Sequence, residues 1–208
     1  MLRGKSLKIN KTIAWLALFL CIAQVVLVFL SWGISAVFPD AFIRSLLSSE
    51  GIRWFFGNFT KNLATPMLVW LLLGSVAYGA LVESEIITAI SHPQRLTYRE
   101  QFAMRVIYVV IFVYIMVLLL LTVVPHAVLL SVTGALFPSS FSDSIVAIVC
   151  FGISLVSVIY GVMSGRFANL VDVFNALTIG ITYTLPLWLL YILMAELYFS
   201  VSFVFFVD

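Results

Sequence analysis

The chain has 208 residues, of which 63% are hydrophobic and 10% are charged, and its formal net charge is +2. A typical soluble domain is about half apolar and a quarter charged, so this composition excludes an ordinary soluble protein. The small, dispersed positive charge gives no reason to expect a nucleic-acid partner. The apolar residues occur in long runs without polar alternation, which favours membrane-spanning helices over barrel strands.

A run of about 20 apolar residues is long enough to cross a bilayer as a helix, and on that basis we predict an all-α membrane protein with about five spans. The chain forms a single membrane domain in this interpretation. The predicted spans cover about residues 12–38, 66–90, 102–124, 144–163 and 176–207. The last stretch exceeds one crossing, and Pro186 inside it removes a helical hydrogen bond. It is therefore either one kinked, tilted span or a re-entrant piece followed by a span.

The N-terminal segment is similar to a signal peptide, because basic residues precede an apolar run. The run from Ile13 to Val37 is longer than the usual ~7–15 residue apolar core and lacks a clear cleavage site, so we interpret it as an uncleaved first span. Basic residues gather on one predicted side of the membrane: Arg3, Lys5, Lys8, Lys11, Arg95, Arg99, Arg105 and Arg166. The positive-inside rule then predicts a cytoplasmic N-terminus.

The segment over residues 42–63 alternates aromatic and aliphatic residues with charged ones and is too polar to span. This pattern predicts an amphipathic helix that lies in the membrane interface. Its centre contains Glu50, Gly51, Arg53 and Trp54. Two interpretations remain open: a packing and anchoring element, or a lid over an external cavity.

No motif of an enzyme, a nucleotide site or a metal site occurs in the chain. The two histidines, His92 and His126, lie in loops on opposite predicted sides of the membrane and cannot share a metal. The two cysteines, Cys21 and Cys150, lie inside apolar runs and are interpreted as small buried hydrophobes. We therefore predict a protein that is not an enzyme and that holds no metal or cofactor.

One ionisable residue, Glu196, lies within the final apolar stretch between Tyr191 and Tyr198. Ionisable groups inside spans are costly and often functional. The transport candidates are accordingly Glu196, Tyr191 and Pro186. The expected partner of Glu196 is a tyrosine hydroxyl, or a polar group on another span or subunit. The alternative is a structural residue near the interface.

Small residues predict where helices approach closely. Gly161 and Gly165 form a GxxxG pattern, which lets two helix backbones meet. Packing within the chain is favoured over dimerisation. Gln24 in the first span is interpreted as a structural hydrogen-bond donor between helices.

Three stretches resemble the AbgT family, which imports p-aminobenzoyl-glutamate and exports antifolate drugs. The first runs from Leu46 to Trp54 and continues through Asn58 and residues 61–62, similar to the family's LLSxEGxRW…N…KN segment. The second is the glycine-rich stretch that ends in an acidic residue, at positions 74–83. The third covers residues 138–145 and then 159–165, similar to the family's PF…SIV start and YGxxxG span.

The chain also departs from the family's pattern. It is less than half as long as a full member, and the family's middle section, with its hairpin and broken helices, has no counterpart here. The family's final section has no counterpart after Asp208 either. No substrate-binding residue is carried over for that reason.

The resemblance implies a secondary transporter without much of the transport core, moving a small organic anion or aromatic compound across a bacterial inner membrane. Its expected partners are the lipid bilayer and either further copies of itself or other membrane subunits, while the substrate is unknown. The alternative is a non-transporting scaffold or accessory subunit of a larger membrane complex.

Overall fold

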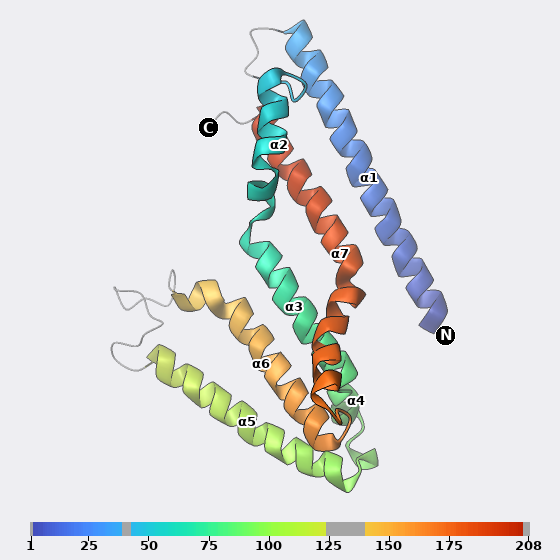
Figure 1. The fold of residues 1–208 in the computed structure, drawn as a ribbon, viewed down its shortest axis with the longest axis vertical. Helices are drawn as coiled ribbons and strands as arrows, with labels where there is room; N and C mark the ends of the chain where they lie inside the picture. Colours follow the sequence, from blue (N-terminus) through green and yellow to red (C-terminus); the bar gives the residue numbers. More distant parts are fainter. Residues whose placement is uncertain (1, 39–42, 124–139, 206–208) are drawn as a thin grey trace. The chain divides into compact units, whose positions relative to one another are not determined.

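A computed structural model of the chain describes residues 2–38, 43–123 and 140–205. Within these ranges all regular secondary structure is helical (Figure 1). The elements are α1 (Leu2–Val37), α2 (Ser49–Leu63), α3 (Pro66–Glu83), α4 (Ile86–Ser91), the 3₁₀ helix η1 (Pro93–Arg95), α5 (Tyr98–Val123), α6 (Ser140–Ser164) and α7 (Leu170–Phe205). Helices α1, α3, α5, α6 and α7 are long and apolar enough to cross a membrane. The prediction of an all-helical chain with five helices that are long and apolar enough to span a membrane is confirmed.

The second predicted span is shorter than expected. Helix α3 ends at Glu83, and a separate short helix, α4, begins at Ile86. Between them Glu85 has a φ of 54°, in the left-handed region that few side chains adopt. The prediction of one span over residues 66–90 is therefore wrong, because the chain turns at Glu85.

The final apolar stretch forms one helix, α7, of 36 residues that continues through Pro186. At about 1.5 Å per residue such a helix is about 54 Å long, whereas the hydrocarbon core of a bilayer is about 30 Å thick. A helix of this length must tilt or extend beyond the hydrocarbon. Of the two alternatives for this stretch, the structure has the single long helix.

The chain divides into two compact units, and α3 and α7 contribute residues to both. The first unit comprises residues 1–69 and 185–208. Its core consists of Leu27, Leu46, Phe203 and Val204. The Arg44 N–H donates to the Val204 carbonyl at 3.2 Å, which ties the segment before α2 to the end of α7.

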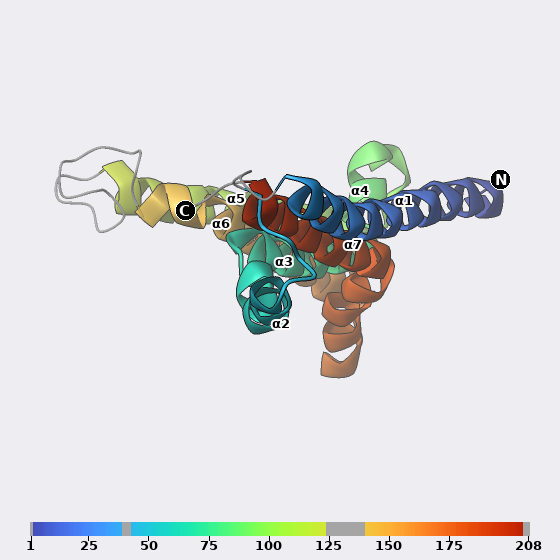
Figure 2. The same ribbon diagram turned by 90° about the horizontal axis from the view of Figure 1, so that it is seen from above.

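The second unit comprises residues 70–184. Helices α5 and α6 lie side by side in it, as both views show (Figures 1 and 2). The Tyr114 hydroxyl donates to the Ile148 carbonyl at 2.7 Å and links these two helices. The core of this unit consists of Ile86, Ala89, Ala103, Ile107 and Tyr160.

Large apolar side chains remain exposed along the candidate spans. On α1, for example, Trp15 is 63% exposed and Phe19 is 66% exposed. A soluble monomer rarely exposes contiguous apolar surface of this extent. Lipid or further membrane helices would cover these faces, in agreement with the composition.

Candidate functional site

The buried carboxyl group of Glu196 is the most unusual polar group of the first unit. Glu196 lies on α7 and is 6% exposed. Neither of its carboxyl oxygens has a hydrogen-bond partner in the part of the chain that the structure describes. Asn62 on α2 lies beside it and interacts with the carboxyl group, but the Asn62 Nδ2 atom completes no hydrogen bond. These two buried polar side chains are thus neighbours, yet neither the carboxyl oxygens of Glu196 nor the amide nitrogen of Asn62 completes a hydrogen bond among the described residues.

The fold of α2 explains how Asn62 reaches this position. The Ser48 hydroxyl caps the helix by accepting the Gly51 N–H at 3.0 Å. Gly51 packs against the backbone of Leu46 so closely that a Cβ atom there would lie 2.7 Å from the Leu46 Cα. Further along α2, Trp54 stacks on Phe203 of α7, with ring centroids 4.4 Å apart. These contacts dock one face of α2 against α7, and Asn62 lies near the end of that face.

A second polar pair continues the site along α7. The Gln24 Nε2 atom of α1 donates to the Ser200 hydroxyl at 2.8 Å. Ser200 is fully buried and lies one helical turn after Glu196, on the same side of α7. The Gln24 Oε1 atom is buried and has no hydrogen-bond partner among the described residues. We name Gln24, Asn62, Glu196 and Ser200 the Glu196 cluster; its members come from α1, α2 and α7.

The Glu196 cluster has the composition of a site for a small hydrophilic species. A buried, unpaired carboxylate is costly, and proteins normally neutralise it or pair it. The cluster offers carboxyl, amide and hydroxyl oxygens together with amide N–H donors. A proton, a hard cation or ordered water could each be held by such groups.

The other two transport candidates, Tyr191 and Pro186, occupy positions with a structural role. The Tyr191 hydroxyl donates to the Leu63 carbonyl at 2.7 Å and lies 2.7 Å from the Thr65 hydroxyl. Tyr191 therefore binds the end of α2, and its hydroxyl is engaged by Leu63 and Thr65. Tyr198 is 69% exposed. Pro186 lies inside the continuous helix α7.

The predicted interfacial segment forms helix α2 only from Ser49 onward. Glu50 and Arg53 are exposed, whereas Gly51 is buried. Around the helix, the side that carries Ile52, Phe56 and Phe59 is apolar and exposed. The sequence therefore gives α2 three sides, of which one packs on α7, one is apolar and one is polar.

The two glycines of the predicted GxxxG pattern have separate roles. Gly161 is in contact with the ring of Phe167, just after the end of α6. Gly165 lies beyond α6 with a φ of +85°, which favours glycine because it has no Cβ. Gly161 thus makes room for the following turn and Gly165 permits that turn, and both contacts are within the second unit.

The closest helix approach in the second unit involves Gly180, which the sequence analysis did not single out. A Cβ atom on Gly79 of α3 would lie 2.5 Å from the Gly180 backbone nitrogen of α7. Across the same crossing the Thr184 hydroxyl donates to the Ser75 hydroxyl at 2.7 Å. The spacing of Ala176, Gly180 and Thr184, four residues apart, is the signal that could have predicted this contact.

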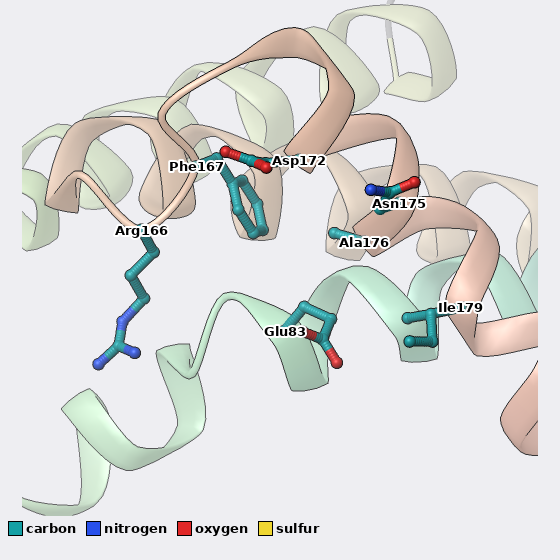
Figure 3. A pocket seen from close by; sticks show the side chains of 7 residues that line it. All are labelled: Glu83, Arg166, Phe167, Asp172, Asn175, Ala176 and Ile179. Carbon is teal, nitrogen blue, oxygen red and sulfur yellow. The ribbon is translucent and has the colours of Figure 1, made fainter.

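Charged residues form a second polar region, at one end of the second unit. Arg166 lies 2.7 Å from a Glu85 carboxylate oxygen and 3.7 Å from one of Glu100. Next to it is an open hollow of about 380 Å³, whose lining is shown in Figure 3: Glu83, Arg166, Phe167, Asp172, Asn175, Ala176 and Ile179.

The carboxylates that line this hollow have local partners. Asp172 accepts the N–H groups of Ala168 and Asn169 at 2.9 and 3.1 Å, which caps the start of α7. Glu83 accepts the Tyr183 hydroxyl at 3.1 Å. The Arg166 guanidinium points away from Asp172 in Figure 3. The hollow is therefore a weaker candidate than the Glu196 cluster.

Residues considered for metal or redox chemistry are dispersed. No group of three or more metal-binding side chains occurs among the described residues. His92 is exposed, and His126 lies outside the described residues, as do Pro138 and Ser139 of the third resembling stretch. Cys150 is half-buried but Cys21 is exposed on α1, so the expectation of a buried thiol is wrong for Cys21 within this chain.

Comparison with known proteins gives no match: no protein-family model, curated protein or solved structure is similar to the chain at a significant level. The function has to be argued from the residues themselves.

Proposed function

We propose that this chain is an integral membrane transport protein that moves a small organic anion or aromatic compound, with the Glu196 cluster as its ionisable centre. The observation behind the proposal is the buried carboxyl group of Glu196, which has no hydrogen-bond partner among the described residues. Ionisable residues within spans commonly mark ion pathways or proton relays. The resemblance to the AbgT family supplies the substrate class.

The setting of Glu196 supports a functional role over a structural one. A structural carboxyl group would be expected to accept hydrogen bonds, as Glu100 does from the Thr97 N–H at 2.8 Å. Glu196 instead meets an amide that is itself unsatisfied. Unsatisfied groups on three separate helices can change partners when a proton, ion or substrate arrives.

The remaining parts of the proposal concern the membrane setting. The chain resides in a bacterial inner membrane with its N-terminus in the cytoplasm, which is supported by the distribution of basic residues. Helix α2 lies in the membrane interface, which is supported by its apolar and polar sides. Further copies of the chain or other membrane subunits cover the exposed apolar faces.

The test is flux through liposomes that contain only the purified chain. Labelled p-aminobenzoyl-glutamate uptake is measured with and without an imposed pH gradient for the wild type, Glu196→Gln and Glu196→Asp. We expect Glu196→Gln to lose the gradient-driven component and Glu196→Asp to retain part of it, because only the acid can exchange a proton. Asp143→Asn is the matched control, since Asp143 is an exposed carboxylate on α6.

Two results would contradict the proposal. Equal flux for wild type and Glu196→Gln, with both variants folded, would remove Glu196 from the mechanism. Absence of flux for a panel of aromatic carboxylates would favour the second function below.

The second candidate function is a non-transporting scaffold or accessory subunit. The specific observation that favours it is the low burial of α1, since only 6% of its most apolar stretch is buried. A helix so exposed is suited to packing against another membrane protein. Crosslinking from Trp32, which is 55% exposed on α1, should then capture one defined partner in cells, whereas lipid-facing exposure gives no defined adduct.

A further inference from the structure

A small surface cavity, open to the outside, lies between α5 and α6 and combines one exposed arginine with apolar side chains. It has a volume of about 320 Å³ and is lined by Tyr98, Arg99, Phe102, Val162 and Met163. Both helices end here, α5 with its first residues and α6 with its last, at the same end of the pair (Figure 1).

The guanidinium of Arg99 is positioned but has no acidic partner. Its Nη1 atom lies 3.0 Å from the place where a Cβ of Gly165 would be, so the group rests on the glycine that follows α6. The ion pairs of the described residues involve Arg166, Glu85 and Glu100, not Arg99. Glu100 is engaged by the Thr97 N–H and by Arg166. Arg99 is exposed and forms no ion pair among the described residues, so an anion from outside the chain can approach it.

Polarity changes along the cavity in the direction of the helix axis. Arg99 and Tyr98 lie at the start of α5, whereas Phe102 lies about one turn deeper, at about 1.5 Å per residue. Tyrosine at a helix end is typical of the headgroup layer of a bilayer. The cavity is therefore cationic at its outer end and apolar toward the span, which matches the order of a phospholipid headgroup and acyl chain.

A second arginine supports this interpretation independently. Arg105 is exposed, although it lies seven residues inside a candidate span. Helical side chains tilt toward the N-terminus of their helix, and arginine near a span end extends its charge toward the headgroups. At 100° per residue, Arg99 and Arg105 flank Tyr98 and Phe102 over an arc of about 120°. Arg105 does not line the cavity, and its Cα lies about 9 Å further along α5 than that of Arg99, so its guanidinium reaches the same headgroup layer by extending toward the start of the helix.

From this arrangement we infer that the cavity between α5 and α6 binds an anionic phospholipid, whose phosphate lies against Arg99 and Arg105 and whose acyl chain lies against Phe102, Val162 and Met163. Arginine binds phosphate oxygens through charge-assisted, often bidentate hydrogen bonds. Basic pockets between spans on the cytoplasmic side are suited to anionic lipid headgroups. The inference requires only that the chain is in a membrane, and it is independent of transport.

The test is lipid retention by the purified full-length chain in native mass spectrometry. Phosphatidylglycerol and phosphatidylcholine are titrated separately against wild type, Arg99→Gln, Arg99→Lys and Arg105→Gln. We expect the wild type to prefer phosphatidylglycerol, and each glutamine variant to weaken its binding about fivefold, the effect of about one arginine near an anionic surface. Arg99→Lys should retain most of the binding because the charge is kept.

The matched control is Arg53→Gln, which removes an exposed arginine of α2 that does not line the cavity and should weaken phosphatidylglycerol binding less than Arg99→Gln does. Because Arg105 is exposed, Arg105→Gln tests the site even if Arg99→Gln fails to fold. Equal binding of the two lipids, or an equal loss in Arg53→Gln, would overturn the inference. Displacement of phosphatidylglycerol by glycerol phosphate at equal concentration would also overturn it, because the apolar wall would then contribute nothing.

Discussion

Gly180 of α7 and Gly79 of α3 meet without room for a side chain on either helix. A Cβ atom on Gly79 would lie 2.5 Å from the Gly180 nitrogen, and one on Gly180 would collide with the Ser75 carbonyl oxygen. The obstacle is backbone in both cases, so no flexible side chain can move aside. The hydrogen bond between Thr184 and Ser75 depends on the same close approach.

Gly180→Ala should therefore destabilise the protein, although glycine to alanine normally stabilises a helix interior by about 0.5–1 kcal/mol. We expect a loss of about 1–3 kcal/mol or more, the usual range for overpacking. Thermal unfolding in detergent, followed by tryptophan fluorescence, measures it. The control is Gly74→Ala on α3, where a Cβ atom would meet nothing within 4 Å. A lower melting temperature for both variants would contradict the crossing geometry.

The turn at Glu85 gives a second prediction, because a left-handed backbone disfavours branched side chains. The free energy of unfolding of Glu85→Val should lie about 1–2 kcal/mol below that of Glu85→Gly, which is the cost of this conformation for a residue with a Cβ atom. Glu85→Gly removes that strain and loses only the ion pair with Arg166, which is half-exposed and therefore worth about 0–1 kcal/mol. We expect Glu85→Gly to melt at or above the wild-type temperature. Equal melting of the valine and glycine variants would show that the turn is not formed.

The stacking of Trp54 on Phe203 gives a third prediction, because it holds α2 on α7. Trp54→Ala should destabilise the protein by about 1–3 kcal/mol, from lost ring contact and lost packing of a half-buried side chain. Hydrogen exchange should accelerate selectively in α2. Trp54→Phe should restore most of the protection, and Trp15→Ala, at an exposed position on α1, should have little effect. Uniform acceleration along the chain would instead indicate global unfolding.

The sequence predicted those parts of the fold that depend on apolar run length. Five long runs became five candidate spans because lipid solvation acts on each helix separately. The sequence analysis missed the break after Glu83. Apolar residues follow it, and the left-handed backbone of Glu85 leaves no mark in the pattern of apolar residues. Gly180 was missed because the close approach depends on the partner helix. Glu196 could be predicted as a site residue because a charged group inside an apolar span is costly in free energy. Asn62 could not be predicted, because it becomes a neighbour of Glu196 only when α2 packs on α7.

Tyr191 tests whether the interactions around the Glu196 cluster are structural. Tyr191→Phe removes the hydrogen bond to the Leu63 carbonyl and the contact with Thr65, and it should cost about 0.6–1.7 kcal/mol, the range for side-chain hydrogen bonds between membrane helices. We expect a lower melting temperature with substrate flux retained in liposomes, because the hydroxyl is bound to Leu63 and Thr65 and forms no hydrogen bond with the carboxyl group of Glu196. Tyr198→Phe, at a position 69% exposed, should change neither quantity. Flux that is lost in Tyr191→Phe at an unchanged melting temperature would instead place this hydroxyl on the transport pathway, beside Glu196.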